Sequence, residues 1–346
     1  MAWYNTNWKY RKKITIDNTK VSADLTDYPV YLDLSELGTD FFDNVQNGGG
    51  DIRITTSDEE TEVPREIVSC NTTAETGEVH FKGDLSGSTD TDFYVYYGNS
   101  EASDYAITAT YGAENVWNSN YKAVYHMKDA DDSTSNSNDG TATGATSGAT
   151  GQIGDGYDFD GSDDYIDISS LSKLQEGVAH SLSGIFKIDA DTGEDFQSLI
   201  ASGIGTSANR VGVVYRQVEN SLAYGIYDGS SYVIAESGSV SQNTFHHFYI
   251  SYNGTSASLY IDGVLQSGSN WPALSQTDRF MLGSDVHIVD KYFNGILDEI
   301  RIANSDLGSD WGITENNNLM SPSTFYSIGS QEEGGKNTTN FFQFFT

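Results

Sequence analysis

The sequence is poor in cysteine and in basic residues, and each shortage excludes a class of protein. Cys70 is the single cysteine of the 346 residues, so no disulfide framework can form within the chain. Only 18 lysines and arginines stand against 50 acidic residues, which gives a formal net charge of −32. Such a surface repels phosphate backbones and anionic lipids, so we expect no nucleic-acid partner. The acidity also suits a cation-rich medium, although solubility alone explains it.

Long hydrophobic stretches are missing as well. No apolar run approaches the ~20 residues that cross a bilayer, so we expect no membrane insertion. The first residues contain neither the apolar segment nor the small-residue cleavage site of a secretory signal. Either a signal has been trimmed and replaced by a start methionine, or the protein reaches an extracellular surface without the secretory route.

The residues that are abundant predict an all-β fold. The chain has 35 glycines, 22 tyrosines and 16 phenylalanines but only 4 prolines, a composition typical of many short strands joined by tight turns. No segment shows a convincing helical period over eleven residues. We predict a β sandwich over residues 1–113, a second sandwich over residues 114–330, and a separate tail over residues 331–346.

The first module shows short alternating segments in a recognisable order. The segments that carry the resemblance are residues 8–11, 14–17, 28–30, 51–54 and 94–99. This third of the chain resembles the DUF2341 family. The resemblance implies an accessory β domain of surface and virion proteins and conveys no activity.

The second module contains strand patterns at roughly eight-to-twelve-residue spacing, as in a two-sheet sandwich. Asn253-Gly254 is the strongest short hairpin signal, and Asp262-Gly263 predicts a second tight turn. Residues 157–168 predict a hairpin with an acidic turn, in which Gly161 tolerates a positive φ. Residues 129–156 are almost wholly small and polar, and we expect them to form a long ordered loop rather than a linker.

Five ordered motifs in this module, residues 159–165, 180–188, 245–254, 259–264 and 295–302, resemble the laminin-G-like (concanavalin A-like) jelly roll. Phe245 departs from the tryptophan that this family usually carries. In such jelly rolls a Ca²⁺ commonly ties the closing strand to the opening one. The resemblance implies Asp298 as its carboxylate, with carbonyls from near His126 and Gly161.

The acidic turn is a second calcium candidate, because Asp160, Asp163 and Asp164 offer the hard oxygen ligands that Ca²⁺ prefers. The alternative is that Asp163 and Asp164 cap the turn and that Asp298 makes ordinary hydrogen bonds.

Catalytic motifs are not found in the sequence. Jelly rolls also host glycosidases, which need two opposed carboxyl groups ~5–9 Å apart. Asp298 and Glu299 are adjacent, so on a regular strand they point to opposite faces. His246 and His247 are also adjacent, so we expect their side chains to point to opposite faces of a strand. Cys70 is expected to be chemically inert. We therefore expect no enzymatic activity.

A lectin-like role depends on aromatic faces and polar groups in shallow sites. The candidate ligand-binding residues lie on consecutive strands and on loops: Tyr215, Tyr224, Tyr227 and Tyr232 on strands, and Trp271 and Trp311 on loops. Tyr224 and Tyr232 have sheet packing as their alternative.

The tail carries four phenylalanines that predict a docking surface: Phe341, Phe342, Phe344 and Phe345. They dock either on a neighbouring subunit, in a homo-oligomer or a particle, or on their own domain. Together these features predict a non-enzymatic adhesion protein on a virion surface, of decoration or tail-fibre type, that contacts glycans. The alternative is a secreted or cell-surface prokaryotic lectin-like module of a larger adhesin or polysaccharide-active protein.

Overall fold

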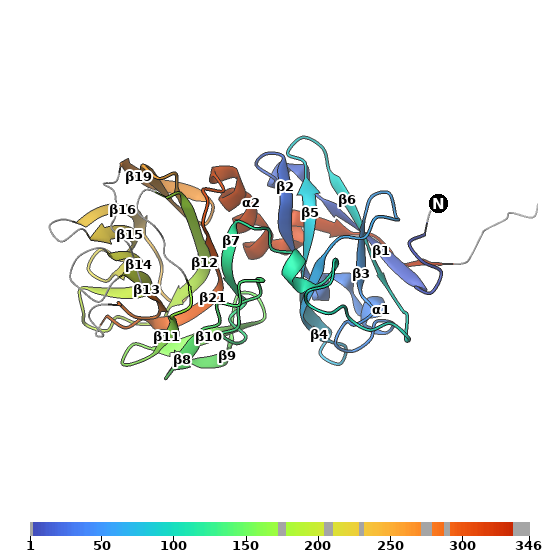
Figure 1. The fold of residues 1–346 in the computed structure, drawn as a ribbon, viewed down its shortest axis with the longest axis horizontal. Helices are drawn as coiled ribbons and strands as arrows, with labels where there is room; N and C mark the ends of the chain where they lie inside the picture. The colour runs from blue at the N-terminus through green and yellow to red at the C-terminus, as the bar shows by residue number, and fades with distance from the viewer. Residues whose placement is uncertain are drawn as a thin grey trace, which may run out of the picture.

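The computed structural model describes residues 3–171, 178–203, 210–227, 232–270, 279–286 and 291–334. Figure 1 shows two β sandwiches placed side by side along the long axis, with helix α2 between them. The all-β prediction is confirmed, since both units are built from antiparallel sheets. No helix among the described residues is long and apolar enough to cross a membrane.

The first sandwich packs a five-stranded sheet on a three-stranded sheet. The larger sheet has the order β22-β1-β6-β3, with β23 also pairing β1, and the smaller has the order β2-β5-β4. Their strands are β1 (Tyr10–Ile16), β2 (Leu25–Asp33), β3 (Arg53–Thr56), β4 (Arg65–Asn71), β5 (Thr76–Leu85) and β6 (Thr91–Tyr97). Short helical turns connect them: η1 (Asn18–Lys20), η2 (Leu34–Leu37), α1 (Thr39–Phe42) and η3 (Ala113–Asn115).

The chain returns to the first sandwich at its end. Strands β22 (Tyr326–Ile328) and β23 (Glu332–Glu333) both pair with β1. Glu332 also binds the buried guanidinium of Arg11 at 2.8 Å. The structure therefore differs from the expected boundaries, because residues after the second sandwich complete a sheet of the first.

The second sandwich has a sheet that faces the first module and a sheet that faces away from it. We call the first the inner sheet; its strand order is β19-β18-β17-β12-β21-β10-β9, and β7 also pairs with β21. We call the second the outer sheet; its strand order is β16-β15-β14-β13-β20-β11-β8. The first eight strands are β7 (Tyr121–Tyr125), β8 (Thr141–Thr143), β9 (Thr146–Thr150), β10 (Asp155–Asp160), β11 (Tyr165–Ile168), β12 (His180–Ile188), β13 (Phe196–Gly203) and β14 (Arg210–Arg216). The others are β15 (Ser221–Tyr227), β16 (Tyr232–Ser239), β17 (Phe245–Tyr252), β18 (Ser256–Ile261), β19 (Val264–Asn270), β20 (Arg279–Leu282) and β21 (Asn294–Ala303).

The predicted turns can now be compared with the strand pairing. The hairpin across Asn253-Gly254 is confirmed by the pairing of β17 with β18, and Asp262-Gly263 joins β18 to β19 with both φ angles positive. The predicted hairpin at residues 157–168 is wrong. Strand β10 pairs with β9 and β21 in the inner sheet, whereas β11 pairs with β8 and β20 in the outer sheet. The acidic turn therefore carries the chain from one sheet to the other.

Residues 129–156 are described throughout and include the short strands β8 and β9. Both strands are mostly exposed, and neither contains a large apolar side chain. This composition explains why no strand pattern is visible in the sequence there.

Helix α2 (Ser309–Met320) joins the two sandwiches, although no helix is predicted there from the residue pattern. Its buried residues recur at helical spacing, yet Thr314, Glu315 and Asn318 among them are polar. Asn318 accepts a hydrogen bond from the Tyr31 N–H at 2.8 Å and donates one to the Tyr31 carbonyl at 2.9 Å, so its amide pairs with the edge of β2. The helix α3 (Pro322–Phe325) then leads into β22.

The two sandwiches share buried apolar residues. The core of the first sandwich continues through Trp311 of α2 to Tyr249 and Tyr260 of the inner sheet. A smaller cluster joins Tyr31 of β2 to Ile185 of β12. We call this region, together with the polar residues buried in it, the module junction.

Candidate functional site

The face of the outer sheet turned away from the sandwich core is the first candidate, and we call it the outer face. Along β11, Ile166 and Ile168 enter the core, so Tyr165 and Asp167 lie on the outer face. Met281 of the neighbouring strand β20 lies directly opposite Asp167, and Tyr165 packs against the small apolar cluster that contains Met281.

An ion pair lies beside this apolar cluster. Arg279 Nη2 is 2.6 Å from Asp167 Oδ2, with side-chain exposures of 41% and 24%. The hydrogen bond that Arg279 donates to Asp167 raises the pKa of Arg279. A half-buried tyrosine ring, the buried apolar cluster beneath it and a partly exposed ion pair therefore meet on two adjacent strands.

Two of the predicted ligand-binding tyrosines lie inside the sandwich. Tyr215 and Tyr224 are both fully buried in the core of the second sandwich. The Tyr215 hydroxyl donates to Asn220 Oδ1 at 2.9 Å, and the Tyr224 hydroxyl lies 2.5 Å from His180 Nε2. In this position neither ring offers a face to a ligand, and Tyr224 has the sheet-packing role that the sequence left open.

The remaining predicted aromatic residues are placed differently from one another. Tyr227 and Tyr232 are paired residues of β15 and β16, and their side chains lie outside the described residues, as does all of Trp271. Trp311 was expected on a loop, but it lies in helix α2. Its ring is buried, packs on Tyr28 and donates to the Tyr121 hydroxyl at 3.1 Å, so Trp311 belongs to the module junction.

The acidic turn brings its three predicted carboxylates together. One ligand atom from each of Asp160, Asp163 and Asp164 lies within 4.8 Å of the others. Asp164 Oδ2 accepts the Asp160 N–H at 2.9 Å, and Asp160 Oδ1 accepts the Ser162 N–H at 2.8 Å, so the turn is also capped by these side chains. Burial raises the pKa of Asp164, and the neighbouring carboxylates add to this effect.

Asp298 does not gather the carbonyls that the resemblance implied. Gly161 lies beside Asn294, at the far end of β21, whereas Asp298 Oδ2 accepts the Ile153 N–H at 2.9 Å. Burial first, and then the charge of Glu299, raise the pKa of Asp298 well above its ordinary value. Calcium binding at Asp298 stays a prediction.

A β-bulge in β21 places Asp298 and Glu299 differently from a regular strand. Ile185 pairs with Asp298 and Ser183 pairs with Arg301, so two residues of β21 oppose one residue of β12. Glu299 has a φ of 49°, the left-handed region that bulges use. Leu297 and Ile300 still enter the core, so both acidic side chains turn toward the first module. The expectation of opposite faces is therefore wrong.

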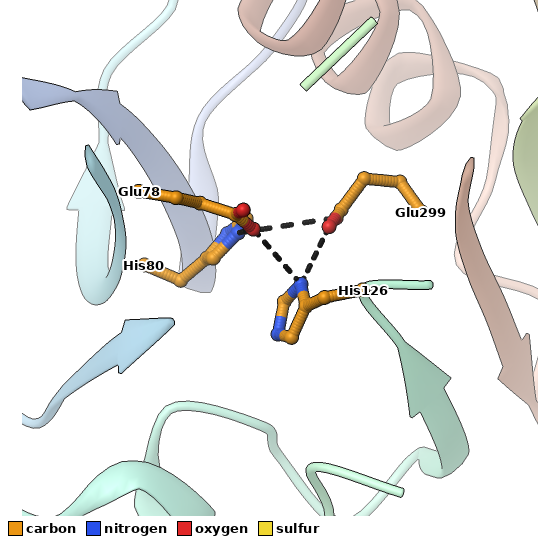
Figure 2. Close-up of side chains that lie close together, drawn as sticks. All are labelled: Glu78, His80, His126 and Glu299. Carbon is orange, nitrogen blue, oxygen red and sulfur yellow. Dashed lines mark hydrogen bonds and ion pairs between the residues drawn. The ribbon is translucent and has the colours of Figure 1, made fainter. Parts of the chain in front are cut away.

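The module junction contains a cluster of four buried side chains that could hold a metal ion: Glu78, His80, His126 and Glu299. Figure 2 shows Glu78 and His80 reaching in from β5 of the first sandwich, while Glu299 and His126 come from the second. His80 Nε2 is 3.0 Å from Glu78 Oε1 and 3.9 Å from Glu299 Oε2. His126 Nδ1 is 3.2 Å from Glu78 Oε1 and 2.5 Å from Glu299 Oε1.

Electrostatics in the cluster follow from its burial. Burial alone would lower the pKa of His126, but the charges of Glu299 and Glu66 outweigh it and raise this pKa well above the ordinary value. Burial alone would likewise raise the pKa of Glu299, but His126, His80 and Arg301 hold it well below the ordinary value. Each group therefore keeps its charge because the oppositely charged group lies beside it.

The network extends beyond the four residues. Arg301 bonds to Glu299 Oε2 at 2.7 Å and to Glu315 Oε2 at 3.2 Å, and His247 Nε2 lies 3.1 Å from Glu315 Oε1. On the other side, Glu66 Oε2 lies 3.3 Å from His126 Nε2. Charged groups from β4, β5, β21 and α2 thus form one buried network that links the modules.

Sequence reasoning missed both the outer-face residues and the junction cluster. Tyr165 and Asp167 alternate with buried isoleucines, which is a visible signal for one strand face. Glu78 and His80 share a strand face through their spacing of two. His126 and Glu299 are 173 residues apart, and nothing in either segment shows that they meet.

Comparison with solved structures finds similar folds at low identity. One similar structure is domain 4 of AbnA, a GH43 extracellular arabinanase from Geobacillus stearothermophilus, solved in complex with arabinotriose. Its sequence is 20% identical and its TM-score is 0.47, and the alignment covers 57% of this chain and 97% of that domain. The Ruminococcus gnavus IT-sialidase CBM40 bound to alpha2,3 sialyllactose is 15% identical with a TM-score of 0.37, over 40% of this chain and 83% of that one. These values are too low for a ligand to be inferred from either structure.

Comparison with sequences gives one match and one absence. No curated protein matches the chain. The family model of the concanavalin A-like lectin/glucanases superfamily matches residues 160–311, a stretch that begins at the acidic turn and ends in α2. The match lies within the second sandwich and α2 and does not extend to the first third of the chain. Residues 160–311 are thus similar to this superfamily, and the jelly-roll expectation for them is confirmed.

Proposed function

We propose that the chain binds carbohydrate without cleaving it, through the outer face of its second sandwich. The observation that carries the proposal is the position of this face. The first sandwich and α2 cover part of the inner sheet, whereas the outer face carries Tyr165, Asp167, Arg279 and Met281 on two adjacent strands. The match of residues 160–311 to a lectin and glucanase superfamily supports the same ligand class.

The chemistry of these side chains suits a sugar. The half-buried ring of Tyr165, supported from below by the buried Met281, provides an apolar surface for the C–H groups of a pyranose or furanose. The Arg279 guanidinium and the Asp167 carboxylate offer donors and acceptors for hydroxyl groups, and Arg279 can also pair with an acidic sugar.

A glycan array followed by calorimetry on the best ligand tests this proposal. We expect the wild type to bind, and Arg279→Ala and Tyr165→Ala to weaken binding at least tenfold. Lys13→Ala is the matched control, since Lys13 also forms a surface ion pair, at 2.8 Å with Asp92, but in the first sandwich. Unchanged affinity in both outer-face variants would refute the location. An array without any bound glycan would refute the ligand class.

The proposal that the chain does not cleave its ligand has its own test. In the described residues, Glu66, Glu78 and Glu299 meet inside the module junction, where no polysaccharide can reach them. We expect no reducing sugar to be released from any polysaccharide that the array identifies. Sustained release of reducing ends by the purified protein would contradict this part.

We also propose that the protein works outside a cell, on a virion surface or as a secreted or cell-surface module. The resemblance of the first third of the chain and the excess of acidic residues support this setting. Antibody labelling of intact particles and cells distinguishes the two cases. The phenylalanines of the predicted docking tail, Phe341, Phe342, Phe344 and Phe345, lie outside the described residues, so their docking stays a prediction.

A further inference from the structure

We propose that Glu78, His80, His126 and Glu299 form a structural site for a divalent transition metal, with Zn²⁺ as the best fit, that fastens the two sandwiches together. The donor atoms are His80 Nε2, His126 Nδ1 and one oxygen from each glutamate. This proposal is independent of carbohydrate binding, because the outer face contributes none of these residues.

The spacing of the donors fits a small tetrahedral ion. Bonds of about 2.0–2.1 Å to Zn²⁺ place tetrahedral ligands about 3.3 Å apart. Glu78 Oε1 lies 3.0 Å from His80 Nε2 and 3.2 Å from His126 Nδ1, which is close to this value, and Glu299 Oε1 lies 2.5 Å from His126 Nδ1. Imidazole nitrogens favour transition metals over Ca²⁺ and Mg²⁺. The side chains of Glu78, His80, His126 and Glu299 are at most 5% exposed, as in closed structural sites.

Charge balance points the same way. Glu66, Glu78, Glu299 and Glu315 bring four negative charges into the junction, and Arg301 supplies one positive charge. A divalent cation at the centre of the cluster offsets two of the uncompensated negative charges. The rings of His80 and His126 are stacked, with centroids 4.6 Å apart, and each directs one nitrogen toward the carboxylates of the cluster.

The surroundings of His126 match those of a metal-bound histidine. A ligating histidine commonly donates its second ring N–H to a carboxylate, which fixes the ring and its tautomer. Here His126 Nδ1 faces the cluster, and Glu66 Oε2 lies 3.3 Å from Nε2. Glu66 is itself held by the Trp117 indole N–H at 2.7 Å. Likewise, Glu299 keeps Oε1 toward His126 while Arg301 binds Oε2.

Titration of chelator-treated full-length protein with ZnCl₂ tests the site. We expect one equivalent of Zn²⁺ to bind per chain and to raise the melting temperature. His126→Gln should abolish both effects. His246→Gln is the matched control, because His246 pairs with Asp262 at 2.7 Å outside the junction and should leave both effects intact. Absence of stoichiometric binding to the wild type overturns the proposal, as does equal binding by His126→Gln, which would indicate adventitious binding to the acidic surface.

The wild type alone also tests the ligand set, whether or not the variants fold. X-ray absorption spectroscopy of the zinc-loaded protein should show four nitrogen or oxygen ligands with the scattering pattern of two imidazoles. A six-coordinate, oxygen-only shell would overturn the proposal.

Discussion

The neighbouring residues Asp298 and Glu299 provide a direct test of the buried network, because both are fully buried but their pKa values shift in opposite directions. Glu299 lies between His126, at 2.5 Å, and Arg301, at 2.7 Å. Glu299→Gln removes the nearest carboxylate from both, which leaves Arg301 with Glu315 and His126 with Glu66 and Glu78. Removal of one partner from a buried ion pair costs about 3–5 kcal/mol, so we expect unfolding equilibria to shift by two to four powers of ten, at roughly 1.4 kcal/mol for each power.

Asp298→Asn is the matched control at the adjacent position. Burial and the charge of Glu299 raise the pKa of Asp298 well above its ordinary value, which favours the uncharged carboxyl group, and an amide has nearly the same shape as that group. The new amide oxygen can still accept the Ile153 N–H, so we expect a loss below about 1 kcal/mol.

Urea unfolding of both variants, followed by tryptophan fluorescence in the presence of a chelator, measures the difference without any contribution from a metal ion. Equal destabilisation by the two substitutions would refute the assigned protonation states. A loss below about 1 kcal/mol for Glu299→Gln would refute the role of the network in joining the modules.

Three further predictions concern separate parts of the chain. Because the pKa of His126 is raised on folding, its contribution to the free energy of unfolding is complete below the unfolded pKa of 6.5 and is lost as pH rises through the folded pKa. In urea unfolding at a series of pH values, stability should therefore decline less steeply with rising pH for His126→Gln than for the wild type. The same pH dependence in both proteins would contradict the assignment. Asn318→Ala removes both hydrogen bonds to Tyr31 and should lower the free energy of unfolding by about 2–4 kcal/mol. The control Asn317→Ala loses one part-buried hydrogen bond and should lower it by less than about 1 kcal/mol. Similar losses of stability in the two variants would contradict the pairing of Asn318 with the edge of β2. Added CaCl₂ should raise the melting temperature of the wild type but not of Asp163→Asn, and an equal response would remove the calcium prediction at the acidic turn.

Two kinds of local signal made strands of the second sandwich predictable from the sequence. Alternation in β11 marks its core-facing residues, and Asn253-Gly254 marks the turn between β17 and β18. The same local patterns do not show which sheet a strand joins. For that reason residues 157–168 were interpreted as a hairpin, although β10 and β11 belong to different sheets.

Helix α2 could not be predicted because its buried side is largely polar. Thr314, Glu315 and Asn318 are buried against partners supplied by other segments, so the apolar period that marks a surface helix is interrupted. A single polar residue such as Asn318 becomes a core residue only when the edge of β2 is there to satisfy its amide.

The junction cluster lies beyond sequence reasoning for two physical reasons. Its members come from segments that only the docking of the two sandwiches brings together. In addition, the bulge at Glu299 changes the face to which this side chain points, and the alternation rule gives no sign of the bulge. The metal expectation at Asp298 was therefore made one residue away from the carboxylate that enters the cluster.

Hydrogen exchange of the full-length protein, with and without the best ligand from the array, tests the central claim most directly. Because we place the carbohydrate on Tyr165, Asp167 and Arg279, ligand should slow amide exchange in β11 and β20 and leave β2, β5 and α2 unchanged. Protection confined to the first sandwich or to α2, with β11 and β20 unaffected, would contradict the proposed binding face.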